Sequence, residues 1–151
     1  MNEQRIQAHL AHLALPPWEV LPDFGLYMDQ LVTYVERCFA EEDALQLTPA
    51  MINNYVKCGL IDRPVGKKYS RESLAQLLMV CRLKQMASLE TMKRLLHPRD
   101  GTTTEAMYHT FGQVQERVRA SFATLPTVDP LACALEAATY QTICRLLLEQ
   151  E

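Results

Sequence analysis

TPAMINNYVKCGLI, residues 48–61, carries the clearest helix signals in this 151-residue chain. Thr48 is a good N-cap, Pro49 suits the first helical turn, and Gly59 suits the position just after the last turn. Apolar side chains recur at helical spacing between these residues, which predicts a helix over residues 48–57 with one buried face. The buried face takes Met51, Ile52, Tyr55 and Val56, and the exposed face takes Ala50, Asn53, Asn54 and Lys57.

The next segment, LIDRPVGKKY at residues 60–69, cannot be helical throughout because Pro64 and Gly66 interrupt it. An apolar pair at its start, a turn near Val65 and a return through Lys68 predict a tight β-hairpin. This hairpin is the one place in the chain where we expect strand pairing.

Helical periodicity dominates the rest of the chain, and alternating strand patterns are almost absent. The further predicted helices are a short one before Pro16, one from about Gly25 to residue 40, one capped by Ser70, one over residues 89–96, one capped by Thr104 and one opened by Asp129 and Pro130. The last is apolar around much of its circumference, so it should lie at the centre of the domain or against a second chain. A composition of 48% hydrophobic and 22% charged residues is that of a globular, mainly α protein.

The charges are unevenly distributed along the chain. Residues 48–99 hold 10 basic and 3 acidic side chains, whereas acidic residues predominate on either side and bring the net charge to −3. A basic middle between acidic flanks is typical of a surface that meets a polyanion. Solvated helix faces are the simpler explanation of charge runs, but four cations, Arg63, Lys67, Lys68 and Arg71, cluster around the predicted hairpin.

Several classes of function lack their signals in the sequence. The five cysteines form no CxxC pair and the four histidines are scattered, so we expect no metal site and reduced, mostly buried thiols. There is no P-loop, GxGxxG, GxSxG or HExxH motif, so we expect neither an enzyme nor a cofactor. No signal peptide is evident and no apolar run reaches the ~18 residues of a membrane helix, which predicts a cytoplasmic protein without a membrane contact.

Three motifs in residues 48–96, TPAMINNYVKCGLI, KKYSRESL and LLMVCRLKQMASLETMKRLL, resemble the DNA-binding domain of MerR-family regulators. A closer likeness, carried by LPDFGLYMDQL together with MINNYVKCGLI and KKYSRE, covers residues 21 to about 97. It is to an uncharacterised bacterial family known only as a domain of unknown function. The resemblance implies a mainly α fold with a winged helix-turn-helix core and a small β-hairpin wing at 21–99. An N-terminal helix and Pro-rich linker at 1–20 would precede this core, and a C-terminal helical pair at 102–151 would follow it.

The resemblance also implies a function, that of a DNA-binding transcriptional regulator. The helix at 48–57 would enter the major groove and the wing at 60–69 would hold phosphates. The residues expected to contact double-stranded DNA are Thr48, Ala50, Asn53, Asn54, Lys57, Arg63, Lys67, Lys68, Tyr69 and Arg71. A homodimer through the C-terminal helices is implied as well, with its two reading helices about one DNA turn, ~34 Å, or a multiple of it apart.

Two alternatives remain open at this point. One is a helical protein-interaction adaptor that keeps the fold without binding DNA. It is favoured by the acidic flanks and by Asn53, which stands where the MerR family often has arginine. The other is a regulator that senses a small-molecule effector. Its ligand would lie near Met107, Tyr108, Phe111 and Tyr140, although core or dimer contacts explain these side chains more simply.

Overall fold

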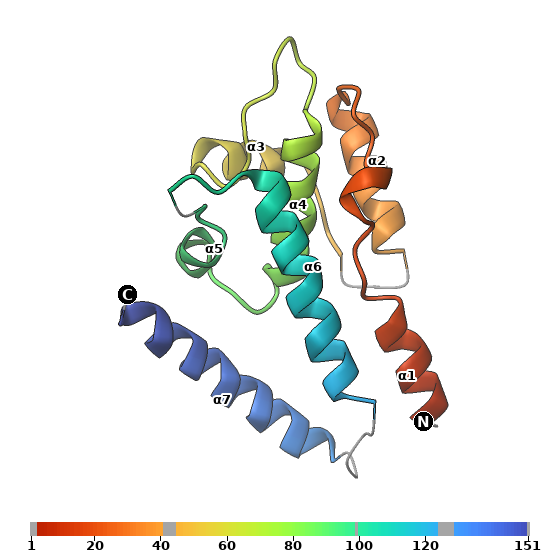
Figure 1. The fold of residues 1–151 in the computed structure, drawn as a ribbon, viewed down its shortest axis with the longest axis vertical. Coiled ribbons are helices and arrows are strands. Elements are labelled where there is room, and N and C mark those ends of the chain that lie inside the picture. Colours follow the sequence, from red (N-terminus) through yellow and green to blue (C-terminus); the bar gives the residue numbers. More distant parts are fainter. Residues whose placement is uncertain (1–2, 41–44, 99, 124–128, 151) are drawn as a thin grey trace.

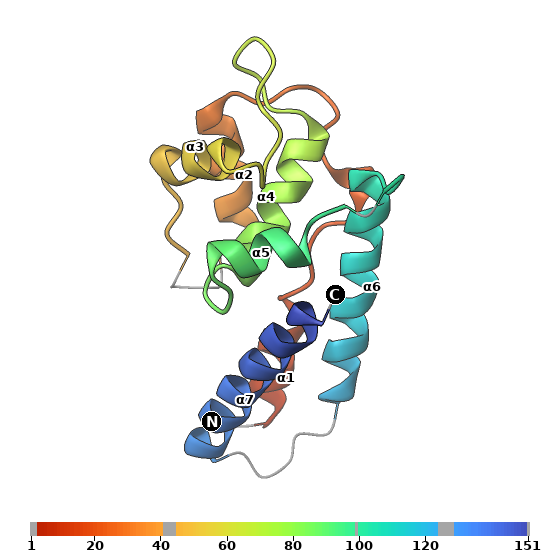
Figure 2. The ribbon, with the colours of Figure 1, turned by 90° about the vertical axis from the view of Figure 1, so that its left-hand side faces the viewer.

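The structure, a computed structural model, describes residues 3–40, 45–98, 100–123 and 129–150. The helices in these residues are α1 (Glu3–Ala11), the 3-10 helix η1 (Trp18–Val20), α2 (Met28–Cys38), α3 (Pro49–Lys57), α4 (Arg71–Leu83), α5 (Leu89–Leu95), α6 (Thr104–Ser121) and α7 (Pro130–Glu149). Figures 1 and 2 show α2, α3, α5 and α6 around α4. The turn between α3 and α4 lies at one end of the molecule, and α1, α7 and the C-terminal half of α6 extend towards the other.

Helix α4 is the centre of the fold because nearly its whole circumference is apolar. All residues from 73 to 81 are buried except Gln76. Helices α2 and α6 pack directly against it. The predictions of a mainly α protein and of a helix capped by Ser70 are therefore confirmed, and the Ser70 Oγ accepts a hydrogen bond from the Ser73 N–H at 3.1 Å.

The caps at Thr48 and Asp129 are also confirmed, since each side chain accepts a backbone N–H of the helix that it precedes. Two helix starts differ from the prediction. Thr103 caps α6 in place of Thr104. Helix α2 begins at Met28, because Leu26 is extended and exchanges two backbone hydrogen bonds, of 2.9 and 2.7 Å, with Tyr69.

The predicted winged helix-turn-helix with a β-hairpin wing is wrong, because the described part of the chain contains no strand and no sheet. Between α3 and α4 the chain makes a tight turn in which Val65 and Lys68 form a single bridge, with hydrogen bonds of 2.9 and 3.1 Å. Gly66 and Lys67, at the centre of this turn, both have positive φ, of 56° and 66°. The predicted turn is therefore present, but no ladder extends from it.

The ladder ends after one pair because the next hydrogen-bonded pair would join Arg63 to Ser70. The Ser70 carbonyl instead accepts the Leu74 N–H in the first turn of α4 at 3.0 Å. The N–H of Asp62 donates to the Gln76 side chain, and its carbonyl accepts from the Ser73 hydroxyl. On the returning side, Tyr69 pairs with Leu26 from the segment before α2. The outgoing arm is thus bound to α4, and the returning arm is bound to the start of α2.

The five cysteines are free, as expected, but only Cys81 is buried. Burial raises the pKa of its thiol to about 12, which makes it an inert core residue. Cys133 is exposed on α7 and the other three are half-buried, so the expectation of mostly buried thiols is wrong.

The end of the molecule opposite the turn has little core. No residue of α1 or α7 is buried. Polar contacts hold these helices instead, including a hydrogen bond from Gln7 on α1 to the Phe122 carbonyl and one from Gln141 on α7 to the Met86 carbonyl. Helices α6 and α7 occupy the C-terminal segment, and of the two places expected for the last helix, the centre of the domain is excluded because α7 has no buried residue.

Tyr108 on α6 attaches the N-terminal linker to the core. Its ring is 4% exposed and lies 6.1 Å from that of Trp18, and its hydroxyl donates to the Pro16 carbonyl at 2.5 Å. Burial raises the pKa of this phenol well above its usual range. The hydroxyl therefore stays protonated and acts as a hydrogen-bond donor at any physiological pH.

Tyr108→Phe should lower the free energy of unfolding by about 1–2 kcal/mol, because it leaves the partly buried Pro16 carbonyl without this donor. Urea denaturation followed by circular dichroism measures the change. Tyr140→Phe is the matched control, because Tyr140 is 71% exposed. Equal stability of the two variants would contradict the structural role of the hydrogen bond.

Candidate functional site

The exposed face of α3 carries polar and basic side chains and no acidic one. Ala50, Asn53, Asn54 and Lys57 are all exposed, whereas Ile52 and Tyr55 on the opposite face are buried. This is the division that the helical spacing predicts. Thr48 stands at the start of the helix, where its hydroxyl oxygen accepts the Met51 N–H and is occupied by capping.

Three cations follow on the connection from α3 to α4. Arg63, Lys67 and Lys68 are exposed on or beside the turn that forms one end of the molecule (Figure 1). The Lys68 ammonium lies 5.3 Å from the centre of the Tyr27 ring, a cation–π contact that holds it at the surface. The turn therefore presents fixed positive charge beside the polar face of α3.

Two of the predicted DNA contacts belong to the body of the fold instead. The Tyr69 ring is 4% exposed and forms part of the core. Arg71 lies 3.6 Å from the Asp23 carboxylate, with its guanidinium 5.4 Å from the centre of the Trp18 ring. Its side chain is only 24% exposed, so this charge is largely used within the protein.

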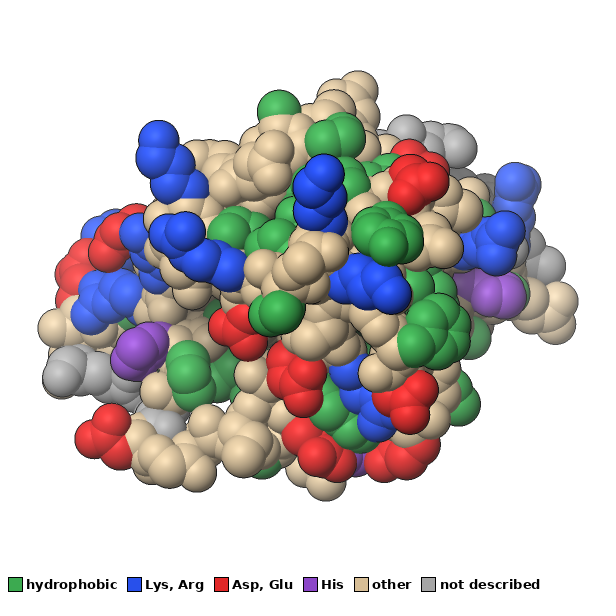
Figure 3. Space-filling model, turned by 90° about the horizontal axis from the view of Figure 1, so that it is seen from above, with side chains coloured by type: hydrophobic (Ala, Val, Ile, Leu, Met, Phe, Trp, Pro, Cys, Tyr) green, Lys and Arg blue, Asp and Glu red, His purple; other side chains and the backbone are tan. Residues whose placement is uncertain are grey.

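Exposed apolar residues also lie at this end of the molecule, and the sequence patterns did not predict their exposure. Val65 at the turn is 85% exposed, and Phe24 and Tyr27 are 66% and 47% exposed. The bridge between Leu26 and Tyr69 brings the last two to the turn, a pairing that local spacing cannot reveal. Figure 3 shows Lys and Arg side chains spread among hydrophobic ones at this end, with most of the acidic side chains in view gathered below them.

Three acidic residues, Glu41, Glu42 and Asp43, stand in the sequence between α2 and α3 and lie outside the described residues. Of the carboxylates that are described near the turn, Asp23 is paired with Arg71. Asp62 is exposed and uses its backbone groups to join the turn to α4.

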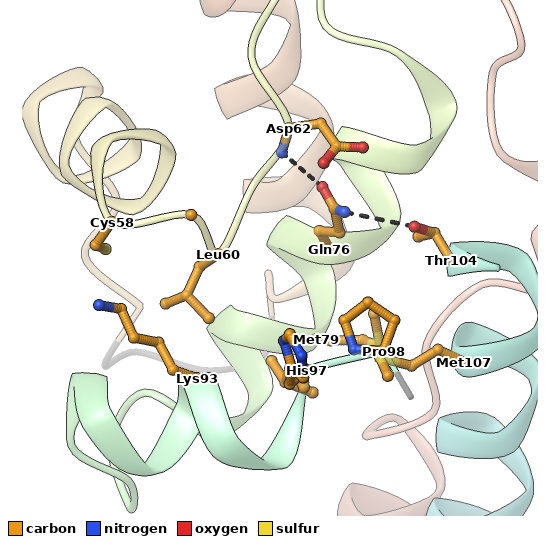
Figure 4. A pocket seen from close by; sticks show the side chains of 12 residues that line it. Cys58, Leu60, Asp62, Gln76, Met79, Lys93, His97, Pro98, Thr104 and Met107 are labelled. Carbon is orange, nitrogen blue, oxygen red and sulfur yellow. Dashed lines mark hydrogen bonds between the residues drawn. The ribbon is translucent and has the colours of Figure 1, made fainter. Parts of the chain in front are cut away.

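A cavity of about 240 Å³ lies behind α3, between its C-terminal end and helices α4, α5 and α6 (Figure 4). Gln76 crosses one wall of it. Its side-chain oxygen accepts the Asp62 N–H at 2.8 Å, and its amide nitrogen donates to the Thr104 hydroxyl at 3.4 Å. Apolar side chains of Leu60, Met79 and Met107 line it together with the cationic or titratable side chains of Lys93 and His97.

The four residues expected near a small ligand do not line one common cavity. Met107 lines the cavity behind α3, whereas Tyr108 and Phe111 line a separate hollow that Trp18 also borders. Tyr140 is exposed on α7 and borders neither of them. No group of three or more His, Cys, Asp or Glu side chains within the described ranges could hold a metal ion. None of the helices in those ranges is long and apolar enough to cross a membrane.

The sequence of residues 16–111 assigns this chain to a protein family. Residues 16–111 match the profile of the family described as Domain of unknown function (DUF1836), and the chain belongs to that family. No curated protein and no solved structure matches the chain. The comparisons therefore confirm the likeness to an uncharacterised family, while none of them supports the likeness to MerR regulators. The match spans η1 to the middle of α6 and includes α3, the turn and the cavity.

Gly25→Ala should destabilise the protein by about 1–3 kcal/mol, because a Cβ at this position would lie 2.6 Å from the Cβ of Lys68 and force the turn to move. Gly112→Ala is the control: a Cβ there meets nothing within 4 Å, and helix propensity should stabilise it by about 0.5–1 kcal/mol. Thermal denaturation of both variants measures the difference. Similar effects at the two sites would show that Lys68 does not pack against Gly25.

Proposed function

We propose that this protein binds double-stranded DNA and acts as a transcriptional regulator. The observation that carries the proposal is the exposure of the polar face of α3 together with the exposed cations of the turn that follows it. Ala50, Asn53, Asn54 and Lys57 on α3 are exposed, with Lys67 and Lys68 beyond them, and α3 has no acidic side chain. A polyanion could approach this surface without meeting a carboxylate on the helix.

The amide and the ammonium side chains on this surface suit different contacts with DNA. An asparagine amide can form a bidentate pair with adenine in the major groove, so Asn53 and Asn54 would read bases. Lys57, Lys67 and Lys68 would contact phosphates, which supply affinity without sequence information. The cation–π contact with Tyr27 would lower the entropic cost of holding Lys68 against a phosphate.

The sequence adds two supports to this proposal. The segment from 48 to 99, which contains α3 and the turn, is the only one of the three segments with an excess of basic residues. The order of the motifs in residues 48–96 resembles that of MerR-family regulators, although the turn replaces a strand-paired wing. Such a regulator would act in the cytoplasm.

A test of the proposal measures binding to random-sequence DNA at two salt concentrations. The Lys67→Ala/Lys68→Ala variant should bind more weakly, with a salt slope smaller by about two units, because each phosphate contact contributes nearly one unit. Asn53→Ala/Asn54→Ala should keep the slope and lose discrimination among sequences.

Arg117→Ala is the matched control, since Arg117 is an exposed cation on α6, away from the turn. Absence of binding by the wild type at low salt would contradict a DNA-binding function. The second candidate, a protein-interaction adaptor, would then be preferred, because the exposed Val65, Phe24 and Tyr27 give this end an apolar character as well.

We also propose that the protein is a homodimer through α6 and α7. Nine large apolar side chains on these helices and at the end of α6 are between 40% and 71% exposed. They are Val114, Val118, Phe122, Leu131, Leu135, Tyr140, Ile143, Leu146 and Leu147. Together they expose on the order of 800 Å², which is about the area that one partner contributes to a standard interface.

The charge pattern of α7 favours a second copy of this chain as the partner. The helix has three charged residues, Glu136, Arg145 and Glu149, and the last two pair with each other at 2.9 Å. A face that is almost neutral and apolar is complementary to itself, as a two-fold interface requires.

Light scattering coupled to size exclusion should therefore give the mass of two chains for the wild type. Leu135→Glu/Leu146→Glu should give one chain, because it buries charge in an apolar interface, while circular dichroism shows the helices retained. Val20→Glu is the control, since Val20 is exposed on η1. A monomeric wild type at about 100 µM would exclude the dimer, because interfaces of this size usually dissociate well below that concentration.

A further inference from the structure

We propose that the cavity behind α3 binds a small organic anion, a carboxylate with a short apolar body, and that its occupancy strengthens DNA binding. The binding step stands independently of the function proposed above, whereas its effect on DNA affinity rests on it. The argument depends on the cavity's lining, its charge, its construction and its position.

The lining provides a surface for an apolar body. Met79 forms part of it and is only 1% exposed, and Leu60 and Met107 lie on two other elements beside it. Thioether side chains adapt to ligands of varied outline because they are flexible and polarisable. With a volume of about 240 Å³, the cavity lies below the roughly 300–1,000 Å³ of pockets for drug-sized molecules, so it fits a smaller ligand.

The charge at the rim selects an anion. Lys93, in the last turn of α5, and His97, two residues after the end of this helix, lie on one side of the cavity (Figure 4). Neither forms an ion pair with another residue in the described part of the chain. The carboxylate that borders the cavity, Asp62, lies on the other side of it in Figure 4. A ligand carboxylate could therefore pair with Lys93 without competition from a protein carboxylate.

The wall between these parts is held by defined hydrogen bonds. Both ends of the Gln76 amide are engaged, one by the Asp62 N–H and the other by the Thr104 hydroxyl. The side chain thereby joins the connection after α3, helix α4 and the start of α6. A cavity whose walls are held in this way is already formed before a ligand arrives, which lowers the entropic cost of binding.

The position of the cavity connects it to the proposed DNA surface. Cys58, which ends α3, and Leu60 both border the cavity. The Leu60 N–H donates to the carbonyl of Tyr55 in the last turn of α3, at 2.9 Å. A ligand held between Leu60 and Lys93 would join the end of α3 to α5 and restrict the motion of the helix that presents Asn53 and Asn54.

Three probes of similar size test the chemistry: hexanoate, hexanol and hexylamine, each measured by isothermal titration calorimetry and by thermal shift. Hexanoate should bind in the millimolar range, at least tenfold more tightly than hexanol, and hexylamine should not bind. Lys93→Met/His97→Gln should reduce hexanoate affinity about tenfold and leave hexanol unchanged. Arg117→Met, which removes an exposed cation from α6 outside the cavity, should have no effect.

Equal binding of hexanoate and hexanol, or unchanged hexanoate affinity in the Lys93→Met/His97→Gln variant, would overturn the anion site. Absence of hexanoate binding to a wild type that unfolds cooperatively would overturn it as well. If hexanoate binds, DNA affinity is then measured with and without it, and about a fivefold increase is expected. Hexanoate binding in a protein that does not bind DNA would remove the proposed function and leave the anion site intact.

Discussion

The burial of α4 is the constraint on which the rest of the structure depends. A helix that is apolar around nearly its whole circumference must be covered on all sides, and α4 has no exposed residue between 73 and 83. Helices α2 and α6 meet this need by direct packing, and α3 and α5 stand beside the same helix. The polar face of α3 therefore points outward because its other face, through Ile52 and Tyr55, is required in the core.

A second constraint follows from the polar groups that α4 carries into this core. Ser73 is completely buried and donates to the Asp62 carbonyl, while Gln76 accepts the N–H of the same residue. These two side chains fix the chain that leaves α3, because the buried Ser73 hydroxyl needs a hydrogen-bond partner. The turn with its lysines does not extend into a strand pair, because the next hydrogen-bonded pair would join Arg63 to Ser70, and the Ser70 carbonyl instead accepts the Leu74 N–H in the first turn of α4.

Local signals predicted much of the helical structure. The caps at Thr48, Ser70 and Asp129 and the stop at Gly59 act over three or four residues, so the sequence alone reveals them. The division of α3 into a buried and an exposed face was also predictable from spacing. Non-local pairings were not: the bridge between Leu26 and Tyr69 joins residues far apart in the chain, and it decides where α2 begins and which aromatic residues reach the turn.

The candidate site shows the same limit. The exposure of Lys67 and Lys68 follows from their place in a turn. The contacts of Arg71 were not predictable, because only the fold brings Asp23 and Trp18 to it. The cavity was missed for the same reason, because its lining comes from four separate segments and no motif links Gln76 to Lys93.

The match to the family covers only one of the two surfaces at opposite ends of the molecule. The match to the family spans residues 16–111 and so includes α4, α3, the turn and the cavity, whereas the apolar side chains of α7 and the second half of α6 lie beyond it. Since α7 contributes no buried residue to its own chain, its apolar residues add nothing to the core around α4. The interface proposed for α7 would leave α3 and the turn, at the opposite end, free to meet a different partner.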